Sequence, residues 1–314
     1  MITKTITDIT NYATVASSFT FNKLKSHLQR VATNDIAKYI SDAEYARLEA
    51  YTDADAVVGK AIEIIKDAET NLALFNFLPV GSIQINSGGV SVIIPQGQTD
   101  ANDKDLRDAL RYHKKCGLQA LDRLLTLFEE NEDKFALWKA SKQYTKFKNL
   151  LVNSTAIFND SYNIFESRQT FLSLVSEIET VEYEFIMPSI TNATLTHLKT
   201  TASNDEIFKH VKKLIQKSII FFTVSKTLGS GLYYQSATGF ELRFDVLDYE
   251  RKFGDSKEIS SHIKAQKKQK ETEAIQFLKM AVGLIRANPL LFAYVAPTIV
   301  ERNPFIAGKS IVAL

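Results

Sequence analysis

LALFNFLPVGSIQINSGGVSVII occupies residues 72–94 and combines three local signals in one stretch. Pro79 ends a helical pattern, because proline lacks the backbone N–H that a continuing helix needs. Apolar and polar residues then alternate on both sides of Gly88-Gly89, which is the pattern of a β-hairpin. The stretch therefore predicts a hairpin over residues 82–94, set between two helices.

A strong helical pattern lies on either side of this hairpin. The first runs from residue 55 to residue 78, with apolar residues at helical spacing. The second has an apolar face made of Leu106, Leu110, His113, Cys116, Ala120, Leu121, Leu124 and Phe128. Gly117 interrupts that helix at a cost of about 1 kcal/mol relative to alanine, so we expect a close helix crossing there.

Capping signals predict the remaining helices. The predicted caps are Thr33-Asn34-Asp35, a capping box at residues 41–44, Ser167 and a second capping box at residues 203–206. The helix after Ser167 is expected to end before Pro188, and residues 153–165 have the pattern of an irregular linker. A second hairpin is predicted over residues 232–244, followed by a helix over residues 259–287 that is apolar on two sides.

The predicted fold is therefore mainly α: a helical bundle with two projecting β-hairpins and an extended C-terminal arm. We divide it into an N-terminal helical or extended segment (1–54), a helical core with the first hairpin (55–228), the second hairpin and long helix (229–287), and the arm (288–314). The arm has Phe292, Tyr294 and Phe305 as apolar anchors, and packing on a partner or on its own domain both fit this pattern.

Composition limits the functional classes. The 314 residues carry a net charge of +2, which argues against a strongly basic nucleic-acid binder. The single cysteine, Cys116, excludes an internal disulfide. No apolar run approaches the roughly 20 residues that a membrane-spanning helix needs, and no secretory signal is evident. We expect a protein without a membrane segment, made in the cytoplasm.

The sequence contains no recognisable catalytic, metal or nucleotide motif. The five histidines form no metal-binding pair, and Gly229-Ser230-Gly231 follows a helix rather than the strand that a dinucleotide site requires. Cys116 lies one helical turn from His113, so an unfamiliar Cys–His enzyme site is one alternative, which thiol labelling would test. We expect no enzyme activity and no cofactor.

The segment KFALWKASKQYTKFK at residues 134–148 carries five lysines, no acidic residue and four aromatic residues. Lys139, Lys142 and Lys146 share one stripe of a helix, and the aromatic residues fall on two sides, so we expect a break near Ser141. Lysine with aromatic residues can bind single strands by phosphate contact and stacking. A helical nucleic-acid-binding protein is therefore the alternative function, and a solvated lysine face over a structural aromatic cluster is the other interpretation.

Several stretches resemble one family. These are residues 72–85, WKASKQYT at 138–145, and SRQTFLSL at 167–174 with the following helix that contains Glu182. They resemble proteins with an uncharacterised domain from phages and prophages of Bacteroides-type bacteria, which are similar to head–tail connector (adaptor or ring) proteins. The resemblance covers residues 55–222 and rests on the order of these segments along the chain and on their general residue pattern.

The resemblance implies a structural virion protein. It implies a homo-oligomeric ring of twelve subunits in the neck, docked beneath the portal protein, which extends the channel for packaged DNA and joins the next neck or tail protein. Under this hypothesis Lys139, Lys142 and Lys146 line the channel without reading sequence, and Phe292, Tyr294 and Phe305 contact the portal or a neighbour. The hairpin interface would consist of Ile85, Val90, Val92, Tyr234 and Phe240.

Overall fold

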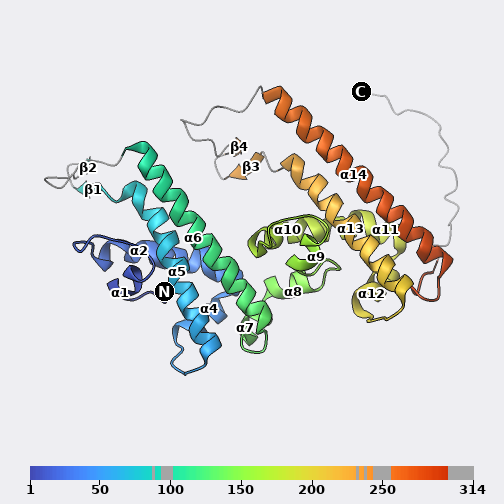
Figure 1. Cartoon of the computed structure of the whole chain (residues 1–314), viewed down its shortest axis with the longest axis horizontal. Coiled ribbons are helices and arrows are strands. Elements are labelled where there is room, and N and C mark those ends of the chain that lie inside the picture. Colours follow the sequence, from blue (N-terminus) through green and yellow to red (C-terminus); the bar gives the residue numbers. More distant parts are fainter. Residues whose placement is uncertain (87–88, 93–101, 231–232, 237–238, 243–255, 296–314) are drawn as a thin grey trace, which may run out of the picture. The chain divides into compact units, whose positions relative to one another are not determined.

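The computed structural model describes residues 1–86, 89–92, 102–230, 233–236, 239–242 and 256–295, and the chain folds as two compact units (Figure 1). Unit 1 consists of Met1–Lys148 and Ile164–Ser173, and unit 2 consists of Asn149–Asn163 and Leu174–Leu314. The chain therefore divides near its middle, rather than at residues 54, 228 and 287. Both units are mainly helical, as the sequence predicts.

Unit 1 is built around the antiparallel pair α5 and α6, with α2 packed on α5. Its elements are α1 (Ile6–Thr10), α2 (Phe21–Val31), the π-turn η1 (Ala32–Ile36), α3 (Ala37–Ile40), α4 (Asp42–Glu49), α5 (Ala56–Phe77), η2 (Leu78–Val80), β1 (Ile83–Asn86), β2 (Gly89–Val92), α6 (Asp103–Glu130), α7 (Ala136–Lys139) and α8 (Lys142–Lys148). The predicted helices flanking Gly88-Gly89 are thus confirmed, with Asp55 as the cap of α5: its Oδ1 accepts the Val57 N–H at 2.9 Å.

Unit 2 is built around the corresponding pair α13 and α14. Its elements are α9 (Thr155–Asn159), α10 (Arg168–Val181), the π-turn η3 (Glu182–Ile186), α11 (Met187–Ile190), α12 (Asn192–Thr200), α13 (Glu206–Ser230), β3 (Tyr233–Ser236), β4 (Gly239–Leu242) and α14 (Ser256–Ala287). The first turns of α10 belong to unit 1. Ser218 and Ser225 of α13 donate hydroxyl hydrogen bonds to α14, at the carbonyl oxygens of Ala274 (2.9 Å) and Lys267 (3.1 Å).

From the first short helix to the strand pair, and apart from η2, the two units contain the same succession of described elements, displaced by about 150 residues, and a long helix follows in each. Strand β1 begins at residue 83 and β3 at residue 233, and β2 and β4 begin at residues 89 and 239. Each strand pair is antiparallel, with Ile83 opposite Val92 and Tyr233 opposite Leu242. Matching positions that carry the same residue include Val31/Val181, Ile36/Ile186, Ile40/Ile190, Leu48/Leu198, Asp55/Asp205, Ile65/Ile215 and Gly89/Gly239. The chain is an internal duplication of one unit, in which a strand pair joins two long helices.

An unusual corner recurs at the same place in both copies. Each π-turn leads into a four-residue helix that ends at a residue with positive φ: Ser41 (φ 73°, ψ 150°) and Thr191 (φ 71°, ψ 154°). A non-glycine residue in this region costs on the order of 1–3 kcal/mol. The hydroxyl oxygens accept the N–H groups of Glu44 (3.3 Å) and Thr194 (3.4 Å) and so cap the next helix. The corner is therefore a structural property of the repeated unit.

Two of the predicted helix boundaries are wrong because of these π-turns. Thr33-Asn34-Asp35 does not cap a helix but lies inside η1, which continues α2. The helix from Ser167 does not end before Pro188, because the chain continues through η3 into α11. Pro188 lies in the first turn of α11, where proline costs no helical hydrogen bond.

Two further local predictions need correction. Ser203 is not the cap of α13, because the carboxylate of Asp205 accepts the N–H of Phe208 at 2.9 Å. Residues 153–165 are not wholly irregular, because they contain α9, whose first turn is capped by the Ser154 hydroxyl. Asp205 and Ser154 thus accept free N–H groups in the first turns of α13 and α9.

Gly117 allows α6 to approach α5 closely, as predicted. A Cβ at this position would lie 2.6 Å from Cγ of Leu72 and 2.7 Å from its Cδ2, well inside van der Waals contact. Leu72 is itself buried, so its side chain has little room to move. The contact between the two long helices depends on the missing side chain.

We expect Gly117→Ala to destabilise the protein. Overpacking costs about 1–3 kcal/mol and the gain in helix propensity is about 1 kcal/mol, so the net loss is about 1 kcal/mol. In a Leu72→Ala background the same substitution should cost much less, because the two clashing side-chain atoms are gone and only the backbone N of residue 72, at 3.3 Å, remains close. Urea unfolding of the two single variants and the double variant measures this difference. An equal cost of Gly117→Ala in both backgrounds would contradict it.

Candidate assembly surfaces

The lysine-aromatic segment forms part of the core of unit 1. It breaks where predicted: α7 ends at Lys139, α8 begins at Lys142, and Ser141 lies between them. The break allows all four aromatic rings to be buried, with exposures of 0% for Phe135, 2% for Trp138, 7% for Tyr144 and 3% for Phe147. No ring of this segment is therefore available to stack on a nucleic-acid base.

These rings join a continuous aromatic cluster. Phe128 of α6 stacks on Phe135 with ring centres 3.8 Å apart, and Trp138 lies 4.7 Å from Tyr144. Phe147 then meets Phe171 of α10 edge to face at 5.9 Å. Residues from α6, α7, α8 and the start of α10 are thus held together by aromatic contacts, each contributing about 0.5–1.5 kcal/mol beyond its buried area.

A buried carboxylate fixes α7 to α4. Glu44 is fully buried, and its Oε2 accepts the N–H of Trp138 at 3.1 Å. Arg47, one turn later on α4, forms an ion pair with Glu44 and donates to the carbonyl oxygen of Lys134 at 3.1 Å. Glu44 is therefore not the second half of a capping box, as residues 41–44 suggested. It orients the aromatic cluster.

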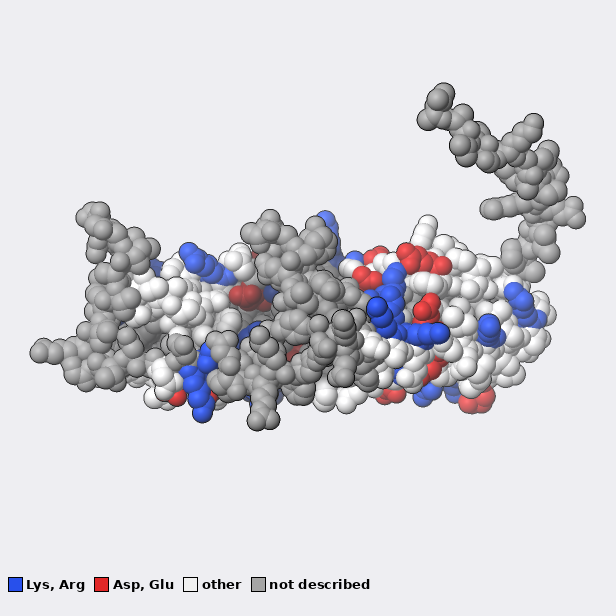
Figure 2. Space-filling view, turned by 90° about the horizontal axis from the view of Figure 1, so that it is seen from above, with Lys and Arg blue, Asp and Glu red and all other residues white. Residues whose placement is uncertain are grey.

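The three lysines proposed for a channel lie on the surface of unit 1, and Lys139 is 3.6 Å from Glu132. Glu132 also pairs with Lys148 at 2.8 Å. On the face shown in Figure 2, basic side chains lie among acidic ones in the described part of the surface. Lys139 is thus partly neutralised by its neighbour, and Lys142 and Lys146 are at exposed positions of the same segment.

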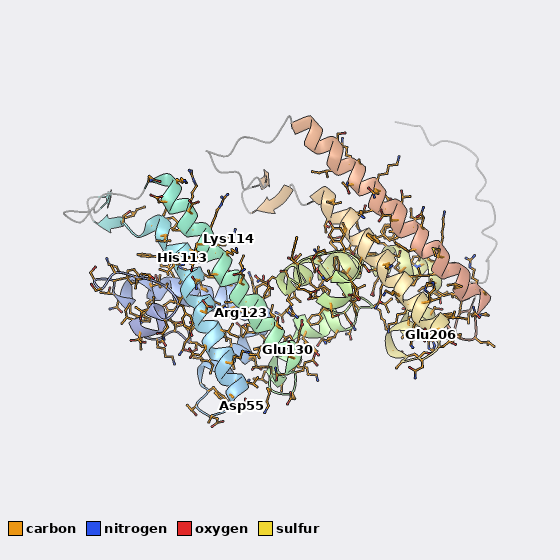
Figure 3. All side chains as sticks on the ribbon, in the orientation of Figure 1. Asp55, His113, Lys114, Arg123, Glu130 and Glu206 are labelled. Atoms are coloured by element: carbon orange, nitrogen blue, oxygen red, sulfur yellow. The ribbon has the colours of Figure 1, made fainter. Side chains whose placement is uncertain are left out.

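His113 is hydrogen-bonded to Asn71 rather than to Cys116 in the contacts that the structure describes. Nδ1 of His113 donates to Oδ1 of Asn71 at 2.9 Å, and Asn71 in turn donates to Asp67 at 2.7 Å. Asp67 pairs with Arg123, which Figure 3 labels with His113 on α6. His113 is half-buried and its hydrogen bond is directed to the core, as expected for a structural histidine. His210, in the first turns of α13, is exposed.

The state of His113 predicts a pH dependence of stability. Burial lowers the pKa of His113 below its ordinary value near 6.5. The unfolded chain therefore takes up this proton before the folded chain does, and His113 contributes to a loss of stability as the pH falls below about 6.5. We expect His113→Gln to reduce the slope of unfolding free energy between pH 7 and pH 5.5. Exposed His210→Gln is the control, and equal slopes in both variants would contradict the prediction.

The C-terminal anchors belong in part to the core of unit 2. Phe292 is fully buried and stacks on Phe208 with ring centres 5.6 Å apart. The Leu291 carbonyl oxygen accepts a hydrogen bond from Nε2 of His197 at 3.2 Å, a contact that matches Arg47 with Lys134 in unit 1. The prediction that Phe292 contacts a partner is therefore wrong, because its side chain is not accessible from the surface of unit 2. Tyr294 is half-exposed, and Phe305 lies outside the described residues.

The projection of the two hairpins and the contacts proposed for them remain predictions. The backbones of Ile85, Val90, Val92, Tyr234 and Phe240 lie in β1, β2, β3 and β4. Their side chains lie outside the described part of the structure. The exposed apolar side chains that are described include Val80 (46%) and Ile83 (40%) at the start of the first strand pair.

Residues 164–173, which lead into α10 and belong to unit 1, are held against α6 by polar contacts. Asp122 on α6 holds the segment: Oδ1 accepts the N–H of Gln169 at 3.1 Å and Oδ2 accepts the Ser167 hydroxyl at 3.2 Å. Glu129, one to two turns further along α6, pairs with Nε of Arg168 at 3.0 Å. Burial raises the pKa of Glu129 above its usual value, although Arg168 opposes this. Sequence patterns did not point to these polar contacts.

The described residues form neither a metal centre nor a membrane span. No group of three or more His, Cys, Asp or Glu side chains in the described ranges is placed to hold a metal ion. None of the helices, as far as their residues are described, is long and apolar enough to cross a membrane.

Comparison with known proteins gives one match. The sequence profile of a family of unknown function (DUF6712) matches residues 43–148, which is less than half of the chain. The matched region runs from α4 to the end of α8 and so falls within the first copy of the duplication. No curated protein and no solved structure matches the chain.

Proposed function

We propose that this chain is a structural virion protein, a head–tail connector that forms a ring in the neck of a tailed phage. In this role it docks beneath the portal, extends the DNA channel and joins the next neck or tail protein. The observation that carries the proposal is the duplication, within a single chain, of one unit in which a strand pair joins two long helices. A ring forms when two complementary patches on each chain meet head to tail and the rotation between neighbours closes, and a chain with two copies of one unit is compatible with such contacts.

The resemblance of residues 72–85, 138–145 and 167–174 to phage connector proteins supports the same role. In the proposed ring, the strand pairs β1–β2 and β3–β4 contact neighbouring subunits or the adjacent ring. Lys142 and Lys146, with Lys139, are the candidates for a channel surface that contacts DNA through phosphate charge alone. Tyr294 and Phe305 remain the candidates for portal contact.

The aromatic residues of segment 134–148 do not support the alternative of a nucleic-acid-binding protein. Single-strand binding of the kind considered for residues 134–148 needs exposed aromatic rings beside the lysines. Trp138 and its three aromatic neighbours in the segment are buried instead. We therefore propose the connector alone.

Electron microscopy of the purified protein, alone and mixed with the portal of its own phage, tests the proposal. The expected result is a ring with a central channel, or a layer of this protein stacked on the portal. Binding should be tested from low to physiological salt, because contacts through exposed lysines weaken as salt rises. Neither a ring nor a portal-bound layer under any of these conditions would overturn the connector role.

A further inference from the structure

The positive charge of the chain is distributed unevenly between the two copies of the unit. The long helices of the first copy, α5 and α6, together carry eight Lys and Arg residues and nine Asp and Glu residues. Those of the second copy, α13 and α14, carry twelve Lys and Arg residues and four Asp and Glu residues. The same helix pair is thus nearly neutral in unit 1 and has a net charge of +8 in unit 2, so its packing does not require this charge.

Contacts just after the two helices fix which residues of α14 match those of α6. Asn131 follows α6 and Asn288 follows α14, and each donates from Nδ2 to the carbonyl oxygen four residues earlier, at 2.9 and 3.0 Å. Four residues after these asparagines lie Phe135 and Phe292, which are both fully buried. Positions of α14 therefore follow those of α6 by 157.

This match reverses the charge of one outward face. In unit 1, Asp122 and Glu129 of α6 hold residues 164–173 through hydrogen bonds and an ion pair. At the matching positions α14 carries Lys279 and Arg286, and both are exposed. Carboxylates that accept hydrogen bonds are thus replaced by cations that donate them, so this face of α14 suits a negatively charged partner.

Two further lysines lie on the same face, nearer the start of α14. At 100° per residue, all four basic residues fall within a sector of about 60° and extend over about 33 Å. We call them the basic stripe: Lys264, Lys268, Lys279 and Arg286. All four are exposed, and no ion pair joins any of them to a carboxylate of the described residues. Glu271 borders the stripe, whereas Glu273 pairs with Lys270 at 2.9 Å on another side of the helix.

The composition of the stripe indicates which polyanion it suits. Lys264 and Lys268 are one turn apart, and like charges at this spacing destabilise a helix, so the stripe is unfavourable for α14 alone. The other described residues of the face near its centre, Ile275 and Val282, are aliphatic. Single-strand binding relies on aromatic rings that stack on unpaired bases, and this face carries none among its described residues. Phosphate groups of a duplex need only the cations.

We propose that the basic stripe of α14 binds duplex DNA through its phosphate groups, without reading sequence. A duplex carries one negative charge per about 1.7 Å of its axis, so a row of cations about 33 Å long meets phosphates in any register. The near-neutral charge of the whole chain does not oppose this contact, because the charge is local. The proposal deepens the proposed function, and rests on it only in taking packaged DNA as the natural ligand.

Fluorescence anisotropy of a labelled mixed-sequence duplex of about 30 base pairs, titrated with the full chain between about 25 and 200 mM salt, tests the proposal. One variant neutralises the stripe with glutamine, whose helix propensity is close to that of lysine. It carries Lys264→Gln, Lys268→Gln, Lys279→Gln and Arg286→Gln. We expect a loss of affinity of at least about ten-fold at the lowest salt. The slope of log affinity against log salt should become shallower by about 3–4, since each phosphate contact contributes about 0.9.

The matched control removes four exposed lysines of unit 1 that belong to no proposed contact. It carries Lys4→Gln, Lys23→Gln, Lys25→Gln and Lys60→Gln. Its net charge equals that of the stripe variant, so only the position of the charges differs. A second variant, Lys279→Asp with Arg286→Glu, gives α14 the residues that α6 carries at the matching positions. Because α6 folds with these carboxylates, this variant should keep its far-ultraviolet circular dichroism and still lose DNA affinity.

Each outcome decides the proposal. Loss of duplex binding in both α14 variants, with the control like the unaltered chain, supports it. Equal losses in the stripe variant and the control, or no binding of the unaltered chain at the lowest salt, overturn it. Tighter binding of a single strand of equal length, or of poly-L-glutamate, than of the duplex would also overturn it. The poly-L-glutamate result would indicate an acidic protein surface as the partner instead.

The same measurements separate this surface from the connector role. Stripe-dependent DNA binding by a protein that forms neither a ring nor a portal-bound layer in electron microscopy would overturn the connector role alone. A ring or portal-bound layer formed by a protein whose DNA affinity does not depend on the stripe would overturn the assignment of the stripe alone.

Discussion

Replacement of Glu69 by alanine is expected to lower the free energy of unfolding of unit 1 by about 3–5 kcal/mol. Glu69 lies in α5 and is fully buried. Its Oε1 accepts the Ile2 N–H at 3.1 Å, its Oε2 accepts the Thr3 N–H at 2.7 Å, and the Tyr45 hydroxyl also donates to it. Alanine would leave the Thr3 N–H and the Tyr45 hydroxyl without this acceptor, whereas the Ile2 N–H keeps the Tyr45 hydroxyl oxygen at 3.0 Å, and each unpaired buried donor costs about 1–3 kcal/mol.

The arrangement around Glu69 needs an acceptor with two free oxygens. Burial and the Glu69 carboxylate raise the pKa of Tyr45 far above its ordinary value, so its hydroxyl stays protonated and keeps donating. Glu69→Gln preserves the shape of the side chain but turns an NH2 group toward N–H donors. We expect Gln to destabilise nearly as much as Ala, which would not happen if Glu69 only filled space.

Trp138 is the only tryptophan in the chain and lies in unit 1, so its fluorescence during urea unfolding reports on that unit. Glu63→Ala on the same helix is the matched control. Its side chain is 54% exposed, pairs with Lys66 and accepts the Tyr12 hydroxyl at 2.5 Å, and exposed contacts of this kind contribute about 1 kcal/mol each. A cost for Glu69→Ala no larger than that for Glu63→Ala would show that the N-terminal residues are not held by this carboxylate.

The sequence was sufficient to locate the long helices of unit 1 and to predict the break at Ser141. Both depend on local information: apolar periodicity, Pro79, and an aromatic pattern that one straight helix cannot bury on one side. Gly117 could be assigned to a close crossing because a glycine inside a strong helix costs stability, and a tight helix contact offsets that cost. The π-turns could not be predicted, because a single i→i+5 turn shifts the helical pattern by only about one residue, and a shift that small has no residue signature of its own.

The duplication is the largest feature that local patterns missed. Its signal is present in the sequence, since the chain compared with itself at a displacement of 150 aligns Asp55 with Asp205 and Gly89 with Gly239. Few residues are identical because the repeat preserves burial rather than chemistry. Glu69, for example, corresponds to Ile219, and both are fully buried. The polar contacts of Asp122 were missed for a different reason: they join residues more than forty positions apart, and no short motif records them.

The assignment of Phe292 shows where hydrophobicity alone misleads. A sparse apolar segment near prolines predicts either a docking arm or a self-packing tail, and composition does not separate the two. The ring of Phe292 packs on Phe208, which occupies in unit 2 the position of Val58 in unit 1. The duplication thus resolves the choice for this residue, because Phe292 follows α14 as Phe135 follows α6, and both are fully buried.

Trp138→Ala is expected to destabilise unit 1 by about 3–5 kcal/mol, the usual cost of removing a large aromatic side chain from a core. Trp138 is 2% exposed, meets Phe128 at 5.3 Å and Tyr144 at 4.7 Å, and has its backbone N–H held by Glu44. Because the variant lacks the fluorescent probe, far-ultraviolet circular dichroism would follow its unfolding in urea. Trp138→Phe should cost clearly less, since it keeps an aromatic ring in the cluster.

The same variants separate the two interpretations of residues 134–148. If the rings form a core, Trp138→Ala loses stability, whereas Lys142→Ala, on an exposed position of the same segment, changes it by less than about 0.5 kcal/mol. If the rings formed a stacking face, Trp138→Ala would keep its stability and lose affinity for a single-stranded oligonucleotide, by about 1–3 kcal/mol per base. Measured side by side, a stable Trp138→Ala with weakened oligonucleotide binding would reverse the assignment of this segment from scaffold to binding surface.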